Sequence, residues 1–155
     1  MTLRQRFLRG MTVHLVKLCV GCDTVQELKD WQTERLKRLK RAGKTPEHCH
    51  RTSQTPRRRD ELLDGGSLYW VIRGEVLCRQ RLIDVRPFVD EDGIGRCQLV
   101  LAPKVIATQP RPCRPFQGWR YFPTDDAPKD LDRAGRGTAD MPEALRRELR
   151  GLGLL

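Results

Sequence analysis

The part of the sequence that most constrains the fold is residues 60–87, DELLDGGSLYWVIRGEVLCRQRLIDVRP. It contains, in order, a short helical stretch, the pair Gly65-Gly66, an aromatic stretch, Gly74 and a long basic stretch. Apolar, β-branched and aromatic residues on both sides of a glycine are typical of a β-hairpin. The sequence therefore predicts paired strands over residues 68–72 and 75–85, around which the other elements can be arranged.

Alternation along these strands assigns side chains to two faces of a sheet. Tyr69 and Trp70 are adjacent, so we expect one of them to point into the core and the other to point outward. In the second strand, the two predicted faces carry Leu77, Ile83 and Val85 on one side and Val76, Cys78 and Leu82 on the other.

Periodicity and turn residues predict the remaining elements. Thr24 and Glu27 have the spacing of a capping box, and apolar residues recur on one face of the following helix, residues 24–42. Prolines exclude a helix and a central strand between residues 109 and 122. Further strands are expected at residues 12–20, 97–101, 105–108 and 119–122, with an ambiguous one within 47–55 and a short helix at 60–63.

These elements describe one α+β domain with a curved, mainly antiparallel sheet, one long amphipathic helix and a short C-terminal helix. Residues 1–10 are expected to be a disordered or non-native extension before Met11, and residues 11–123 the domain itself. Residues 124–139 are rich in Asp, Pro and Gly and predict a partly disordered loop. Residues 140–155 would form the helix that packs on the domain.

The charge of the chain favours an acidic partner. The net charge is +10, and residues 1–60 hold 15 Lys and Arg against 6 Asp and Glu, whereas residues 61–155 hold 15 against 14. Such asymmetry is typical of proteins that bind nucleic acid. Of the 30 basic residues 23 are Arg and no Asn is present, which coding bias explains equally well.

Arginine and aromatic residues provide the candidate nucleic-acid contacts. Guanidinium groups pair with phosphates and aromatic rings stack on bases. The residues expected to make such contacts are Arg57, Arg58, Arg59, Tyr69, Arg79, Arg81, Trp119 and Arg120. The alternative is that the aromatic rings belong to the core or the sheet edge and the arginines are solvated.

Cysteine and histidine residues suggest two other kinds of site. Cys19-x-x-Cys22 lies between a predicted strand and a helix start, where a thiol pKa can be lowered for redox chemistry. With His48 and His50 the same pair could supply four zinc ligands, although a single CxxC is a weak signal. Apart from this possible zinc, no cofactor and no catalytic constellation is predicted.

Several stretches together resemble a family of bacterial proteins of about 150 residues, catalogued as domain of unknown function number 1489. They are VHLVKLCVGCDTVQELKDWQ, RRRDELLDGGSLYWVIRGEVLCRQRLIDVRP, PRPCRPFQGWRYF and APKDL. The resemblance implies an alphaproteobacterial protein that begins at Met11, and it implies no activity. In outline, the element order is also similar to PUA-like and ASCH-type small barrels, which commonly bind RNA.

The sequence therefore predicts a cytoplasmic, non-enzymatic module that binds nucleic acid, RNA in particular, and no membrane. No usable signal peptide is present, and residues 11–20 are too short to span a bilayer. Two alternatives stay open: a thiol-dependent enzyme or metal-binding protein that uses Cys19 and Cys22, and a protein–protein adaptor that uses the proline-rich aromatic segment. The oligomeric state is left open.

Overall fold

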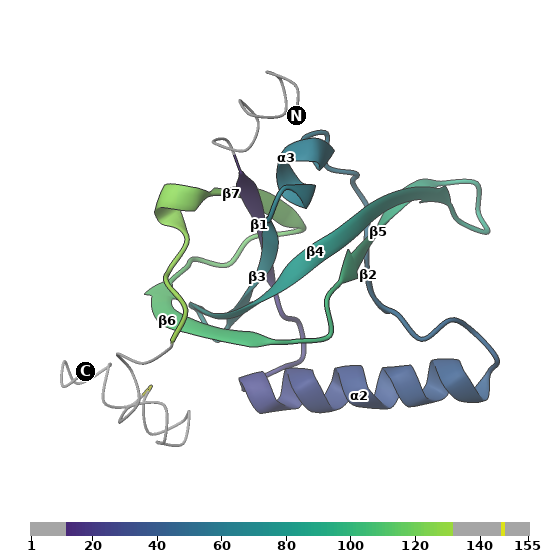
Figure 1. Cartoon of the computed structure of the whole chain (residues 1–155), viewed down its shortest axis with the longest axis horizontal. Coiled ribbons are helices and arrows are strands. Elements are labelled where there is room, and N and C mark those ends of the chain that lie inside the picture. The colour runs from purple at the N-terminus through teal and green to yellow at the C-terminus, as the bar shows by residue number, and fades with distance from the viewer. Residues whose placement is uncertain (1–11, 132–146, 148–155) are drawn as a thin grey trace.

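The computed structural model of the chain describes residues 12–131 and Arg147 (Figure 1). The expected N-terminal extension lies outside these residues, as do the second half of the expected loop and, apart from Arg147, the expected C-terminal helix. The described part is mostly β-sheet with few helices. Its elements are β1 (Val13–Leu18), α2 (Val25–Arg41), β2 (His48–Thr52), α3 (Arg59–Leu63), β3 (Ser67–Ile72), β4 (Glu75–Val89), β5 (Gly95–Leu101), β6 (Ile106–Pro112), β7 (Trp119–Pro123) and the 3-10 turn η1 (Thr124–Asp126).

The seven strands form one curved, mixed sheet in the order β2-β5-β4-β3-β1-β7, with β6 paired to β4. β1 and β3 run parallel, and the other strand pairs of the described residues are antiparallel. This confirms the predicted curved and mainly antiparallel sheet. The path ends at β2 and β7 without joining them, so the sheet is open and closure into a barrel is not confirmed.

The strand that organises the sheet is β4, as the hairpin prediction implies. It pairs with β3 along its first half and with β6 and β5 in succession along its other edge. Arg73 and Gly74 both have positive φ, 50° and 80°, as expected for a two-residue type I′ hairpin turn. β4 extends to Val89, four residues beyond the predicted end, because β5 continues to pair with it there.

Two β-bulges on β4 make the predicted face assignment wrong. The register shifts between Val76 and Cys78 and again between Leu82 and Asp84, so each bulge reverses the alternation. As a result Leu82 and Val85 belong to the same core cluster, whereas Ile83 is 54% exposed. A pattern of period two cannot show where a bulge lies.

Both faces of β3 are buried, which corrects a second expectation. Tyr69 is 5% exposed and Trp70 is 3% exposed, so neither points to solvent. Trp70 belongs to the larger core cluster, on the side of α2, and Tyr69 belongs to a second cluster on the opposite face with Val16 and Phe122. The two faces of the sheet are called below the helix face and the pocket face, respectively.

On the helix face, α2 runs below the strands in the view of Figure 1. Thr24 caps the helix by accepting the amide of Glu27 at 3.1 Å. Of the expected apolar face only Leu28 is fully buried, and Gln32 is buried beside it. The amides of Gln32 and Gln80 exchange two hydrogen bonds, at 2.8 and 3.0 Å, and thus attach the helix to the sheet.

The chain reaches β3 through α3 and the Gly65-Gly66 pair. A Cβ atom on Gly66 would lie 2.2 Å from the carbonyl oxygen of Leu62 and 2.5 Å from that of Val13. No side chain fits at that distance, so only glycine allows α3, β1 and β3 to approach so closely. Gly65 and Gly66 thereby set the position of one wall of the pocket described next.

Candidate functional site

A pocket of about 610 Å³ lies on the pocket face, where β1, β3, β4 and β6 meet the segment that follows η1. Most of its lining groups are polar or charged. The lining residues are His14, Gly65, Tyr69, Arg79, Gln109, Pro128, Lys129 and Asp130. A concave site with a few convergent polar groups is the usual form of a ligand-binding site.

An ion pair forms one wall of the pocket. Arg79 donates to Asp130 through Nε at 2.7 Å and Nη2 at 2.8 Å, which is the bidentate arrangement. Its third nitrogen, Nη1, donates to Oγ of the fully buried Ser67 at 2.9 Å. The hydrogen bonds from Arg79 lower the pKa of Asp130, so the pair stays ionised at neutral pH.

The segment that carries Asp130 is held against β6 by backbone hydrogen bonds. The Gln109 amide donates to the Lys129 carbonyl, and the Leu131 amide donates to the Ala107 carbonyl, each at 2.8 Å. These bonds place the exposed Lys129 at the rim of the pocket. This part of the predicted loop therefore has a defined position.

His14 contributes a neutral imidazole. Its Nδ1 accepts the amide hydrogen of Ser67 at 2.9 Å, which leaves the ring hydrogen on Nε2. Burial and, to a smaller extent, the charge of Arg79 together lower the pKa of His14 to about 4. The ring is therefore an uncharged hydrogen-bond donor at neutral pH.

Tyr69 lines the pocket with a side chain that is almost entirely buried. The ring makes edge contacts with His14 at a centroid distance of 5.1 Å and with Phe122 at 5.3 Å. Burial raises the pKa of Tyr69, so its hydroxyl remains protonated. Tyr69 is 5% exposed, so its ring offers little open surface for the predicted stacking on a base.

The chemistry available in the pocket is recognition by hydrogen bonds and charge. Lys129, the Tyr69 hydroxyl and the Nε2–H of His14 are donors suited to a polar or anionic group. Ser67 is the hydroxyl nearest to Arg79, and it is fully buried as an acceptor of that guanidinium. The Ser67 hydroxyl is therefore occupied by a structural hydrogen bond and is not open to solvent.

Four of the eight predicted contact residues share the pocket face. Tyr69 and Arg79 line the pocket itself, and alternation places Arg81 on the same face as Arg79. Arg120 also lies there, with its guanidinium 4.6 Å from the ring centroid of Phe116, which packs on the Tyr69 cluster.

The other four lie outside the pocket, in contacts within the protein. Arg58 forms an ion pair with Glu61. The indole nitrogen of Trp119 donates to the carbonyl of Gln54 at 2.8 Å, and the Arg57 amide donates to the Tyr121 hydroxyl at 2.8 Å. These contacts attach the chain before α3 to β7, so the indole hydrogen bond of Trp119 is already used.

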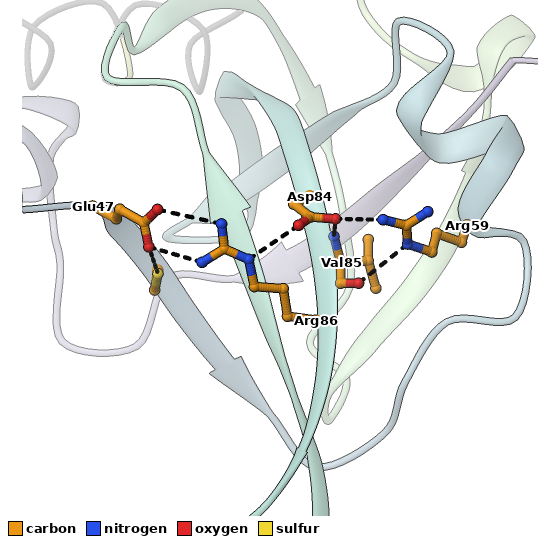
Figure 2. Close-up of polar contacts among 6 residues, drawn as sticks. Glu47, Arg59, Asp84, Val85 and Arg86 are labelled. Carbon is orange, nitrogen blue, oxygen red and sulfur yellow. Dashed lines mark hydrogen bonds and ion pairs between the residues drawn. The ribbon is translucent and has the colours of Figure 1, made fainter. Parts of the chain in front are cut away.

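Arg59, the last of the eight, belongs to a chain of ion pairs across the outside of the sheet (Figure 2). It donates to Asp84 at 2.6 Å and to the Val85 carbonyl at 3.2 Å. Arg86 joins the other oxygen of Asp84, at 3.0 Å, to Glu47, at 2.9 and 3.3 Å. Hydrogen bonds from Arg86 and Arg59 lower the pKa of Asp84.

The cysteine and histidine residues form no metal centre in the described part of the chain, where no three His, Cys, Asp or Glu side chains gather to hold an ion. His50 contacts Trp70 edge-on, and burial lowers its pKa to about 4. For Cys19, burial and then the neighbouring Cys22 raise the thiol pKa, the opposite of the lowering expected at a helix start. Cys19 is therefore a protonated thiol at neutral pH.

Sequence reasoning did not select His14, Gln109, Lys129 or Asp130 as site residues. His14 was the only one with a signal of its own, as one of two titratable side chains, with Lys17, in a strand whose other residues are apolar. The partner of Arg79 lies 51 residues further along the chain. No local pattern could show that the two meet.

The profile of a protein family, described as "Protein of unknown function (DUF1489)", matches residues 15–155. The chain belongs to the DUF1489 family. This match contains most of β1, the elements from α2 to β7 and all pocket residues except His14, so it covers nearly the whole fold. No curated protein and no solved structure matches the chain. In the described residues of this DUF1489 member, no helix is long and apolar enough to cross a bilayer.

Proposed function

We propose that this protein is a non-enzymatic cytoplasmic module that binds single-stranded nucleic acid, RNA in preference to DNA, on its pocket face. The observation that carries the proposal is the convergence of Tyr69, Arg79, Arg81 and Arg120 on that face, around a polar pocket. The preference for RNA rests on the outline similarity to PUA-like barrels and on the hydrogen-bonding groups of the pocket, which suit a ribose hydroxyl.

Arginines stacked on rings support the phosphate-binding part of the proposal. Arg111 lies 5.2 Å from the ring centroid of Phe122, and Phe122 contacts Tyr69 at the pocket. Arg120 is stacked on Phe116 in the same way. A guanidinium stacked by its face keeps its N–H edge available for phosphate oxygens and loses little freedom on binding.

In this mechanism, exposed cations hold the phosphate backbone and the pocket receives one nucleotide. Lys129, Arg81 and Arg120 would neutralise phosphates, and His14, Tyr69 and Gln109 would bond to the sugar or base edge. Arg79 already uses its nitrogens for Asp130 and Ser67, so it shapes the pocket. Recognition would therefore depend on hydrogen bonds within the pocket, without stacking on Tyr69.

The test is fluorescence anisotropy with a labelled single-stranded RNA and the matching DNA over a series of salt concentrations. If Lys129, Arg81 and Arg120 each neutralise one phosphate, log affinity should fall against log salt with a slope of about −2. Lys129→Ala should weaken binding about threefold to tenfold and reduce the slope by about 0.7.

The matched control is Lys29→Ala. It removes the same charge from an exposed position on α2, which packs on the face of the sheet opposite the pocket. It should leave affinity and slope nearly unchanged. Absence of binding to both RNA and DNA at low salt would remove the proposal. Equal losses from Lys29→Ala and Lys129→Ala would show attraction by net charge alone and would remove the pocket face as the site.

A further inference from the structure

Cys19 and Cys22 stand at the two ends of the turn that joins β1 to α2. The turn is made by Val20 and Gly21, and Gly21 has φ 86°, a conformation that glycine adopts without strain. Both side chains pack against the same core cluster, and a side-chain hydrogen bond with Cys22 contributes to the raised pKa of Cys19. In a four-residue turn the first and last Cα atoms lie within about 7 Å, which overlaps the range that a disulfide spans.

Both ends of this turn are held in place by the fold. On the strand side, the Cys19 amide donates to the Val71 carbonyl of β3 at 2.8 Å. On the helix side, Glu27 accepts the amide of Asp23 at 2.9 Å while Thr24 accepts the amide of Glu27. The turn thereby holds the two cysteines at fixed backbone positions, so the effective concentration of one thiol toward the other is high.

We propose that Cys19 and Cys22 are a reversible dithiol/disulfide pair that is oxidised by exchange with a low-molecular-weight disulfide such as oxidised glutathione. This oxidation site is separate from the pocket and does not depend on its proposed function. The reaction consumes two protein thiols and one glutathione disulfide, and it yields one protein disulfide and two reduced glutathione molecules.

The exchange proceeds in two steps. The thiolate of Cys22 attacks one sulfur of glutathione disulfide, forms a mixed disulfide and releases one glutathione thiolate. Cys19 then loses its proton to solvent and attacks the Cys22 sulfur, which forms the Cys19–Cys22 bond and releases the second glutathione thiolate. Cys22 is assigned the first step because the Cys19 thiol is held protonated by its surroundings.

The surroundings of Cys19 affect the second step of the exchange. Burial, the contact with Cys22 and the charge of Glu27 all raise the pKa of Cys19. Less Cys19 thiolate is therefore present at neutral pH, which slows its attack on the mixed disulfide.

The remaining cysteines differ from this pair. Cys78 and Cys97 are fully buried, so a glutathione molecule cannot reach them in the folded protein. Cys49 and Cys113 are partly exposed, and each can serve as a single-thiol control. Cys78 is close enough to Cys19 to influence its pKa, so Cys78 is the other conceivable partner and needs its own variant.

In the experiment, the purified full chain is treated with oxidised glutathione and then unfolded in the presence of a thiol-alkylating reagent. The intact mass gives the number of alkylated cysteines. Four of the six cysteines should be alkylated, because two are joined in the disulfide. Reduction with dithiothreitol before alkylation should make all six available to the reagent. The oxidised protein should be lighter by two hydrogen atoms and should carry no glutathione. Cys22→Ser and Cys19→Ser should each form no internal disulfide.

Two further variants identify the partner. Cys113→Ser and Cys78→Ser should both still lose two alkylatable thiols on oxidation. Six alkylated thiols after treatment, or a glutathione adduct that does not resolve in the unchanged protein, would overturn the proposal. A disulfide that survives in Cys22→Ser and disappears in Cys78→Ser would also overturn it, because the pair would then be Cys19 and Cys78.

Discussion

Two arginine–carboxylate pairs on β4 use the same chemistry in different surroundings. Arg79 and Asp130 meet at 2.7 and 2.8 Å with side chains 22% and 38% exposed, and Arg86 and Glu47 meet at 2.9 and 3.3 Å with side chains 45% and 33% exposed. Arg79 also contacts the buried Ser67. Arg86 instead contacts a second carboxylate, Asp84, on the outside of the sheet.

The difference shows that the neighbours of an ion pair decide its role more than its geometry does. The pair of Arg79 is backed by neutral, desolvated groups, His14 and Tyr69, and so it shapes a pocket. The chain that contains Arg86 links β2, β4 and α3 in solvent, where its charges are screened (Figure 2). Three predictions distinguish the Arg79 pair from the chain that contains Arg86, from the largest expected effect to the smallest.

The largest effect should come from acid, through the histidine beside the first pair. His14 has a pKa of about 4 in the folded protein against 6.5 when unfolded, so the unfolded state binds more protons between these values. Stability is therefore lost as pH falls from 6.5 toward 4, by about 3 kcal/mol from this residue. His14→Asn, which keeps an acceptor for the Ser67 amide, should flatten this dependence in urea unfolding.

The control for this prediction is Glu47→Gln in the surface chain. Hydrogen bonds from Arg86 lower the pKa of Glu47 below 4.5, so its contribution is present above 4.5 and is lost only at lower pH. The variant should leave the slope between pH 6.5 and 4.5 as it is. If His14→Asn left the pH dependence of stability unchanged, His14 would have a normal pKa in the folded protein. Its side chain would then be solvated.

An intermediate effect is expected from Arg79→Met. The change leaves the Asp130 carboxylate and the buried Ser67 hydroxyl without their donor, which should lower the free energy of unfolding by about 2 kcal/mol. A double-mutant cycle with Asp130→Asn measures the coupling directly. Additive losses in that cycle would contradict an energetically coupled pair.

The smallest effect is expected from Arg86→Met. Its partners Glu47 and Asp84 are half-buried, with side chains 33% and 27% exposed, and neither pairs with a buried hydroxyl as Arg79 does, so its loss should be smaller than that of Arg79→Met. About 1 M salt should remove most of the loss from Arg86→Met and little of the loss from Arg79→Met. Thermal unfolding of both variants at two salt concentrations checks this, and the reverse order of salt sensitivity would contradict the comparison.

Local sequence signals predicted the elements near the hairpin well. The turn at Gly74 was predictable because a two-residue turn needs positive φ, which glycine adopts most easily. The start of α2 was predictable because the Thr24–Glu27 spacing is itself a structural contact. In both cases the residues that carry the signal are also the residues that interact.

Features that depend on distant partners were not predictable. The bulges at Leu77 and Ile83 arise from pairing with three other strands, and they reverse a face assignment that alternation alone had made. β6 continues to Pro112 because it is an edge strand, where a missing amide hydrogen is tolerated. Burial of both Tyr69 and Trp70 follows from layers that cover both faces of β3.

The candidate site divides in the same way. Arginine and aromatic composition pointed to Tyr69, Arg79, Arg81 and Arg120, which the fold brings to one face. It could not show that Arg58, Arg59 and Trp119 are already engaged by Glu61, Asp84 and Gln54. It also missed Asp130 and Lys129, because the segment after η1 takes its position from backbone bonds to β6.

The pocket is assembled from distant parts of the chain, from His14 on β1 to Asp130 after η1. No fragment of the chain can therefore form it, and a compound that occupies it binds the native state alone. Such a compound raises the free energy of unfolding by about 2.7 kcal/mol at one hundred times its dissociation constant. A thermal-shift screen of nucleotides and other small anions against the intact chain therefore detects such a compound without any assay of activity.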